Sequence, residues 1–392
     1  TTPIHKPTVM TIPFHKPTVT EEEEKAVLGV LRSKWLTTGI QTKKFESEFA
    51  EYTNCKFAIA VNSFTAAMHV ALAAYGITKG DEVITTPYTY IATVEAIEYV
   101  GARPVLVDIE DDFNISIDRI KFALTKKTRA IIPVHIAGNP CNMEVLRSFA
   151  DENSLFLLQD AAHGIESYWN GKHVSEFGDV AAFSFYATKN ITTAGEGGML
   201  VTNNESIAKR SRRLVLHGIN KDSYQRYLVG GTWKYEVVEL GFKYNMTDVA
   251  ASMGRVQLKK VDTWHIRRHA IVKKYNEAFS QIRGLIVPKE FECTQHAWHL
   301  YILRINLEYF VINRDEMIEE INQTGVSTSV HFIPVHHHPY YYNRITIPQT
   351  GLPNTERLYK SAITLPLYPS MTDKEVYYIV DKVSDLAKTF QK

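Results

Sequence analysis

Lys189 is the residue of this sequence whose surroundings point most directly to chemistry. An apolar run at 183–185 leads to the lysine, and a glycine-rich turn at 195–198 follows it. Burying an ammonium group is costly unless the group is paired or used covalently. A partly desolvated lysine has a lowered pKa and can attack an aldehyde as a neutral amine. In isolation, however, a lysine in a surface loop is the simpler interpretation.

Two further segments change this balance. An apolar strand at 155–159 delivers Asp160, followed closely by His163, and a carboxylate at that place could keep a pyridine nitrogen protonated. It could also be nothing more than a helix N-cap. A strand ending at residue 61 turns through Ser63, Thr65 and Ala66 into a helix, whose first N–H groups would suit a phosphate. Together the segments indicate a phosphate pocket, a pyridinium partner and an amine.

The elements that must position these residues alternate along the chain. Short apolar runs predict strands, and helical patterns separate several of them, which favours an α/β fold with a mostly parallel seven-stranded sheet covered on both faces. Ligands of such sheets lie beyond the carboxyl ends of the strands. The predicted strands are 57–61, 82–85, 104–109, 130–135, 155–159, 180–185 and 199–202, and the predicted helices include 21–35, 43–52, 66–74, 92–99 and 143–151.

The length of 392 residues favours two domains. We expect an N-terminal extension over 1–20, a large domain over 21–264 and a small α+β domain over 265–392. One long helix is predicted over 247–272, strands over 300–307 and 327–332, and a terminal helix over 373–390. The segment His-Lys-Pro-Thr-Val occurs twice, at 5–9 and 15–19, and only one copy need be native.

Composition excludes several classes of protein. The formal net charge of +1 offers no broad basic field for nucleic acid or an anionic membrane. Three cysteines at wide spacing argue against a disulfide framework and favour a reduced, cytoplasmic setting. We expect no membrane span and no secretory signal. The run His336 to His338 invites a metal site, but three consecutive histidines cannot face one ion from a single strand and no carboxylate follows at ligand spacing, so none is predicted.

The sequence resembles the DegT/DnrJ/StrS sugar aminotransferases, pyridoxal-phosphate enzymes of the aspartate-aminotransferase fold, known as fold type I. The resemblance runs from Trp-Leu-Thr-Thr-Gly at 35–39 to Leu-Pro-Leu-Tyr-Pro-Ser-Met at 365–371. Its most specific parts are Asp-Ala-Ala-His at 160–163, the stretch 184–198 around the lysine, Gly-Phe-Lys-Tyr-Asn-Met-Thr-Asp at 241–248 and Val-His-Phe-Ile-Pro at 330–334.

The resemblance implies a role for each matching position. Lys189 would carry the cofactor and shuttle protons, Asp160 would pair with the pyridine nitrogen, and His163 would lie beside the ring. Tyr90 would stack on the ring, and Lys243 would reach the cofactor phosphate of the partner subunit, which implies a homodimer with shared active sites. The positions expected to contact the cofactor phosphate are Ser63, Thr65, Ala66 and Ser184.

The implied reaction transfers an amino group from L-glutamate to a keto-sugar, 4-keto-6-deoxy in form, linked to UDP, GDP or dTDP. His331 is expected to line the sugar pocket, and Arg226 could meet the nucleotide diphosphate. Three alternatives stay open, namely a keto-sugar dehydratase, a 3-aminotransferase and a non-catalytic regulatory relative. Family dehydratases carry histidine at the catalytic position, so a lysine at 189 favours transamination.

Overall fold

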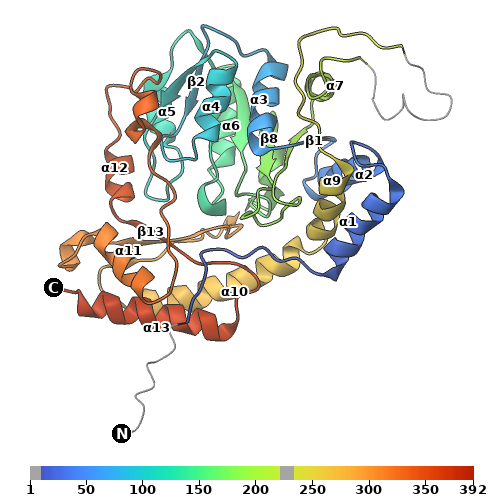
Figure 1. Ribbon diagram of the computed structural model, residues 1–392. Helices are drawn as coiled ribbons and strands as arrows, with labels where there is room; N and C mark the ends of the chain where they lie inside the picture. Colours follow the sequence, from blue (N-terminus) through green and yellow to red (C-terminus); the bar gives the residue numbers. More distant parts are fainter. Residues whose placement is uncertain (1–9, 221–233) are drawn as a thin grey trace.

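A seven-stranded sheet is the centre of the computed structural model, which describes residues 10–220 and 234–392 (Figure 1). The strand order is β1-β9-β8-β5-β4-β2-β3. Six strands run in one direction and β9 runs against both of its neighbours, so six carboxyl ends share one edge. The strands are β1 Phe57–Val61, β2 Glu82–Thr85, β3 Arg103–Leu106, β4 Thr128–Ile132, β5 Phe156–Asp160, β8 Val180–Ser184 and β9 Gly198–Thr202.

Helices bury both faces of this sheet. Ile59 and Val61 of β1 face a cluster with α3, α4 and α7, whereas Ala58 and Ala60 face α2 and α9 on the opposite side. Because successive strand residues point to opposite faces, strands covered on both sides must be apolar throughout. Helices α5 and α6 cover the other end of the second face. The helices are α2 Ile40–Tyr52, α3 Phe64–Tyr75, α4 Ala92–Tyr99, α5 Ile117–Ala123, α6 Met143–Glu152, α7 Glu205–Leu214 and α9 Asp248–Leu258.

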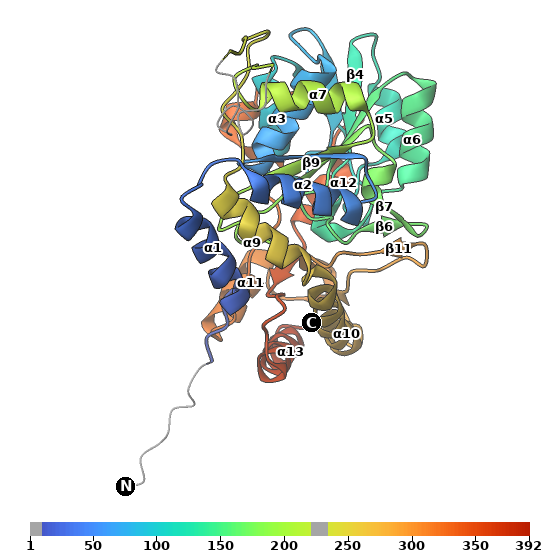
Figure 2. The ribbon, with the colours of Figure 1, turned by 90° about the vertical axis from the view of Figure 1, so that its right-hand side faces the viewer.

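A second, three-stranded sheet lies below the first in Figure 1, with order β10-β12-β13. Helices α10 and α13 lie side by side beneath it, and Figure 2 shows α1 next to α9. The N-terminal segment joins this unit, because Ile12 is fully buried in its core and bonds to Gly325 at 2.8 Å. The elements are α1 Glu21–Ser33, α10 Val261–Phe279, β10 Leu285–Ile286, β12 Tyr301–Ile305, α11 Arg314–Gln323, α12 Pro353–Tyr359, β13 Ala362–Leu365 and α13 Asp373–Thr389; a small sheet is formed by β6 Tyr168–Trp169, β7 Lys172–His173 and β11 Thr294–Gln295.

The α/β class and the mostly parallel seven-stranded sheet are confirmed, and most strand ends fall within a few residues of their predicted places. The single helix predicted over 247–272 is wrong, since α9 ends at Leu258 and α10 begins at Val261. Neither glycine nor proline marks the break. Lys260 at the junction forms ion pairs with Glu22 and Glu23 of α1, both at 2.9 Å, so contacts with a distant helix accompany the change of direction.

The strand predicted over 327–332 is also wrong. Ser329 forms one isolated bridge with Thr364, and Ser327 bonds to Ile12, so the segment pairs with different neighbours one residue at a time. The domain boundary predicted at 264/265 falls within α10 and stays a prediction. In the part of the chain that the structure describes, no helix is both long and apolar enough to cross a bilayer.

Candidate active site

A cavity of about 510 Å³ lies beyond the carboxyl edge of the large sheet and reaches residues of the second unit. It gathers most of the residues singled out by the sequence. The predicted residues that line it are Ser63, Thr65, Tyr90, Asp160, His163, Ser184, Lys189 and His331. This volume is within the range of cofactor and ligand pockets.

Lys189 reaches the cavity from the turn after β8. Its backbone N–H donates to the carbonyl of Tyr186 at 2.9 Å, and no described residue forms a hydrogen bond or ion pair with its Nζ. Burial lowers the pKa of Lys189 to about 8, and the charge of Asp160 acts in the opposite direction. A substantial fraction of the amine is therefore neutral near pH 8 and available as a nucleophile.

Asp160 is the last residue of β5 and is buried. Its Oδ2 accepts from Thr93 Oγ1 at 2.7 Å, and its Oδ1 accepts from the backbone N–H of Ala162 at 3.1 Å. Burial raises the pKa of Asp160, while these two hydrogen bonds and Lys189 oppose the shift. Each carboxylate oxygen retains a second lone pair, so the group can still accept a proton-bearing ring nitrogen.

The amino end of α3 supplies a site suited to a phosphate. Ser63 is the N-cap, with its Oγ accepting from the N–H of Ala66 at 3.1 Å, and Thr65 and Ser184 line the same cavity. The free N–H groups and dipole of a helix start favour an anion. Gly198 of β9 allows this strand to lie close to the start of α3, because a Cβ at position 198 would lie 2.5 Å from the carbonyl oxygen of Ser63.

The imidazoles around the cavity are held neutral. His163 accepts at Nδ1 from the N–H of Ala137 at 3.2 Å, which assigns its proton to Nε2. Burial lowers the pKa of His163 and His299 well below the ordinary value, and that of His331 to about 4. His163 and His299 lie with ring centroids 4.4 Å apart. At neutral pH these rings contribute hydrogen-bonding groups without positive charge.

The wall opposite the large sheet is largely aromatic. Phe332 lies 5.8 Å from His163 and 5.9 Å from Tyr90 between ring centroids, and Phe14 stacks on His331 at 5.2 Å. Tyr90 is 60% exposed, so its ring is open to a ligand in the cavity. His331 also contacts Thr364 Oγ1 at 3.1 Å.

Two of the described residues predicted for the site, Ala66 and Lys243, do not line the cavity. Ala66 is buried in α3 behind Ser63 and presents its N–H to that serine. Lys243 is outside it, with Nζ donating to Asn245 Oδ1 at 2.6 Å. Arg226 lies outside the described residues.

Sequence reasoning missed other residues. Thr93, at the start of α4, donates to Asp160 Oδ2 and also contacts Thr89 Oγ1 in the preceding loop. His15, from the second copy of the duplicated segment, lines the cavity with Phe14. His299 also lines it, although 110 residues separate it from Lys189 (299 − 189). No local pattern connects these two residues.

Comparison with known proteins identifies the family. A profile described as the DegT/DnrJ/EryC1/StrS aminotransferase family matches residues 17–384. The chain belongs to this family. The aminotransferase is 46% identical over 376 residues to an uncharacterised protein of Methanocaldococcus jannaschii, covering 96% of this chain and 97% of that protein. It is 43% identical over 379 residues to the spore coat polysaccharide biosynthesis protein SpsC of Bacillus subtilis, covering 96% and 97%.

Solved structures agree with this assignment. Spr1654 of Streptococcus pneumoniae, described as a candidate sugar aminotransferase and solved in a PLP form, is 32% identical with a TM-score of 0.90, over 97% of this chain and 99% of that one. PseC of Helicobacter pylori, an aminotransferase involved in pseudoaminic acid biosynthesis, is 26% identical with a TM-score of 0.90, over 97% and 100%. The fold is therefore that of fold type I, and the aminotransferase depends on pyridoxal 5′-phosphate. The buried Asp160 carboxylate, the Lys189 amine and the α3 terminus fit that cofactor.

Proposed function

We propose that the aminotransferase moves the amino group of L-glutamate onto C4 of a nucleotide-linked 4-keto-6-deoxy sugar. The observation that carries the proposal is the single cavity that holds Lys189, Asp160 and the amino end of α3 together with an aromatic wall. Neutral imidazoles and aromatic rings suit an uncharged sugar ring better than a second charged group. The names of SpsC and PseC, which refer to polysaccharide and pseudoaminic acid biosynthesis, support a sugar substrate.

Each residue has a separate task in this proposal. Bound pyridoxal phosphate supplies an electron-poor ring that stabilises negative charge on a carbon losing a proton. Asp160 holds the ring nitrogen protonated, and Thr93 and Ala162 keep the carboxylate in place. Ser63 and Thr65 at the start of α3, with Ser184, bind the phosphate group.

Lys189 acts as the acid and base of the transfer. With the cofactor bound, the Lys189 amine would take the proton from Cα of the amino donor and deliver it to the C4′ carbon of the cofactor. In the cofactor-free site, burial lowers the pKa of Lys189 to about 8, so the environment of this amine favours its neutral form more than water does. His163 and Tyr90 both line the cavity, and in this proposal His163 would lie beside the cofactor ring and Tyr90 would stack on it.

The sugar's diphosphate needs positive charge. Of the described residues, Lys189 is the one lysine or arginine lining the cavity. The proposal therefore includes Arg226 as a contact to the sugar's diphosphate. It also includes a homodimer in which Lys243 of one subunit reaches the cofactor phosphate bound by the other. The free cysteines, with Cys293 exposed, support a reducing cytoplasmic setting.

A panel of nucleotide keto-sugars tests the proposed reaction. UDP-, GDP- and dTDP-linked 4-keto-6-deoxy sugars, with 3-keto isomers beside them, are incubated with the cofactor-loaded enzyme and L-glutamate. We expect one 4-keto substrate to yield the 4-amino sugar and 2-oxoglutarate in equal amounts, measured by mass spectrometry. Lys189→Ala should lower the rate by roughly 10³-fold or more, because the amine that moves the proton is gone.

Other products would identify the open alternatives. A deoxygenated sugar without glutamate consumption would point to a dehydratase, and amination of a 3-keto isomer alone to a 3-aminotransferase. Binding of cofactor with no turnover on any sugar would favour the regulatory relative.

A further inference from the structure

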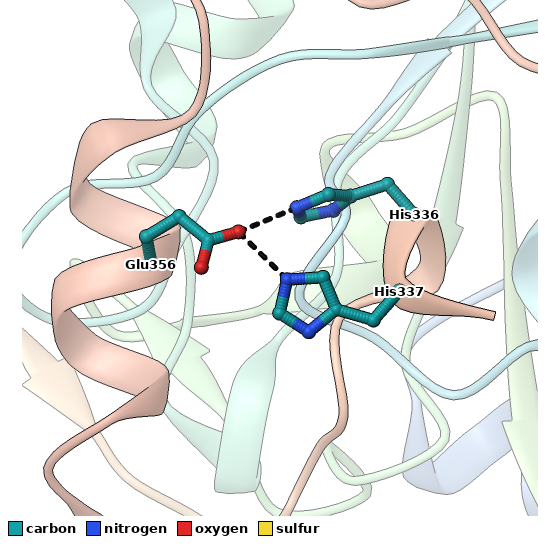
Figure 3. A group of neighbouring side chains, drawn as sticks. All are labelled: His336, His337 and Glu356. Carbon is teal, nitrogen blue, oxygen red and sulfur yellow. Dashed lines mark hydrogen bonds and ion pairs between the residues drawn. The ribbon is translucent and has the colours of Figure 1, made fainter. Parts of the chain in front are cut away.

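A cluster of side chains that could bind a metal ion lies outside the active-site cavity. His336 and His337, on the 3₁₀ turn η4 Val335–His337, both direct Nε2 at the same carboxylate oxygen of Glu356 on α12. The distances to Oε1 are 2.7 Å and 2.8 Å, and Figure 3 shows the three side chains converging from the two elements. The sequence predicted no metal site here, because three consecutive histidines on a strand cannot face one ion and no carboxylate lies nearby in the sequence. In the structure the two histidines lie on a 3₁₀ turn, and the carboxylate comes from another helix.

The donor set matches that of a divalent transition metal. Two imidazole nitrogens and one carboxylate oxygen are ligands that zinc takes, and these three atoms lie within 4.8 Å of one another. Ligand atoms around a tetrahedral zinc lie about 3.3 Å apart, given bonds of about 2.0 Å. The two contacts to Glu356 would therefore open by roughly 0.5 Å on metal binding.

The setting of the cluster favours binding. The side chains of His336, His337 and Glu356 are 14%, 31% and 38% exposed, so the site is half-buried and water can supply a further ligand. The ion would replace the two Nε2 protons, which move to the other ring nitrogens.

We propose that His336, His337 and Glu356 bind one zinc-like divalent ion, with water in the remaining coordination position. The ion would connect two segments that are already anchored to the large sheet. The N–H of Val335 donates to Pro87 at 2.9 Å, and Thr355 of α12 donates its N–H to Asp108 at 2.8 Å. Because η4 begins three residues after Phe332, the bound ion would restrict the motion of the segment that carries His331 and Phe332 of the aromatic wall.

Zinc titration of the full-length, cofactor-loaded enzyme tests the proposal. Isothermal calorimetry with Zn²⁺ alone should show one ion per chain for the wild type. Glu356→Gln keeps an oxygen that accepts both N–H groups but removes the negative charge, so the fold persists while affinity falls by at least about tenfold. His337→Gln should fall similarly. His338→Gln is the matched control, since this neighbour is outside the cluster, and it should bind as the wild type does.

Cobalt gives an independent readout. Co²⁺ should produce visible absorption bands in the wild type and in His338→Gln, and these bands should be lost in His337→Gln. Equal zinc affinity in all four proteins would place the ion elsewhere and overturn the proposal. If none of the proteins binds zinc, the proposal is also overturned. The three side chains would then form hydrogen bonds only with one another.

Discussion

Lys189 shows how burial and one neighbouring charge set the reactivity of a side chain. Desolvation disfavours the ammonium form, whereas the Asp160 carboxylate favours it, and the balance lowers the pKa to about 8. Because only the neutral amine attacks an aldehyde, the rate at which cofactor-free protein captures pyridoxal phosphate should rise with pH and level off above about pH 8.

The Asp160→Asn variant tests whether the Asp160 charge raises the pKa of Lys189. The Asp160 carboxylate raises the pKa of Lys189, so removing its charge should lower that pKa. The pH at which the rate of pyridoxal phosphate capture levels off should therefore be lower. Stopped-flow absorbance of the cofactor measures both proteins, and the titration of the cofactor itself cancels in the difference. A shift to higher pH would contradict the assignment. Turnover of the loaded variant should fall on the order of 10²-fold or more, since the charge facing the ring is lost.

At the scale of elements, a series of buried polar groups connects helix α10 to the loop that carries Lys189. Arg268 of α10 pairs with Glu166 after β5, and both side chains are almost fully buried. Glu166 also accepts from Asn190 at 2.6 Å, and Asn190 contacts Nδ1 of His299 at 3.1 Å. This series reaches the residue next to Lys189. It therefore connects the placement of the catalytic loop to the packing of α10.

Breaking that series should destabilise the fold. Glu166→Gln leaves the Arg268 charge buried and unpaired, which we expect to lower the free energy of unfolding by roughly 3–5 kcal/mol. Urea unfolding followed by circular dichroism measures the change. Glu21→Gln is the control, because its pair with Lys25 is exposed and such pairs contribute little. Equal losses in the two variants would mean that Arg268 is compensated by other groups.

At the scale of the whole molecule, several exposed apolar side chains lie close to Lys243 in the sequence. Val237, Val238 and Leu240 are 62%, 54% and 90% exposed, an arrangement that favours burial against another chain. A second copy of this chain is the partner that the proposed function requires. In the proposed homodimer, Lys243 would act across that interface, since it does not line the cavity of its own chain.

Hybrid dimers test the shared site. Lys189→Ala and Lys243→Ala should each be impaired alone. When the two variants are co-expressed, random pairing makes half the dimers hybrid, and one of the two sites in each hybrid regains both lysines. Activity should return to about a quarter of the wild-type level. If Lys243 served its own subunit, no hybrid site would be complete, and the mixture would stay as inactive as its components.

The sequence alone determined the features that depend on local periodicity. The apolar runs that became β1, β2 and β8 had to be strands buried on both faces, and the residues that followed them had to meet at one edge. That reasoning placed Lys189, Asp160 and Ser63 in one cavity, and the resemblance to the aminotransferase family was confirmed.

Only the tertiary structure decided features that depend on distant partners. The break before Val261 accompanies ion pairs with α1, and His15 and His299 reach the cavity from segments that are far apart in the sequence. The His336 and His337 pair meets Glu356 because a 3₁₀ turn faces α12. Periodicity reports which face of an element is buried, but not which remote side chain will lie against it, since that depends on the packing of the whole chain.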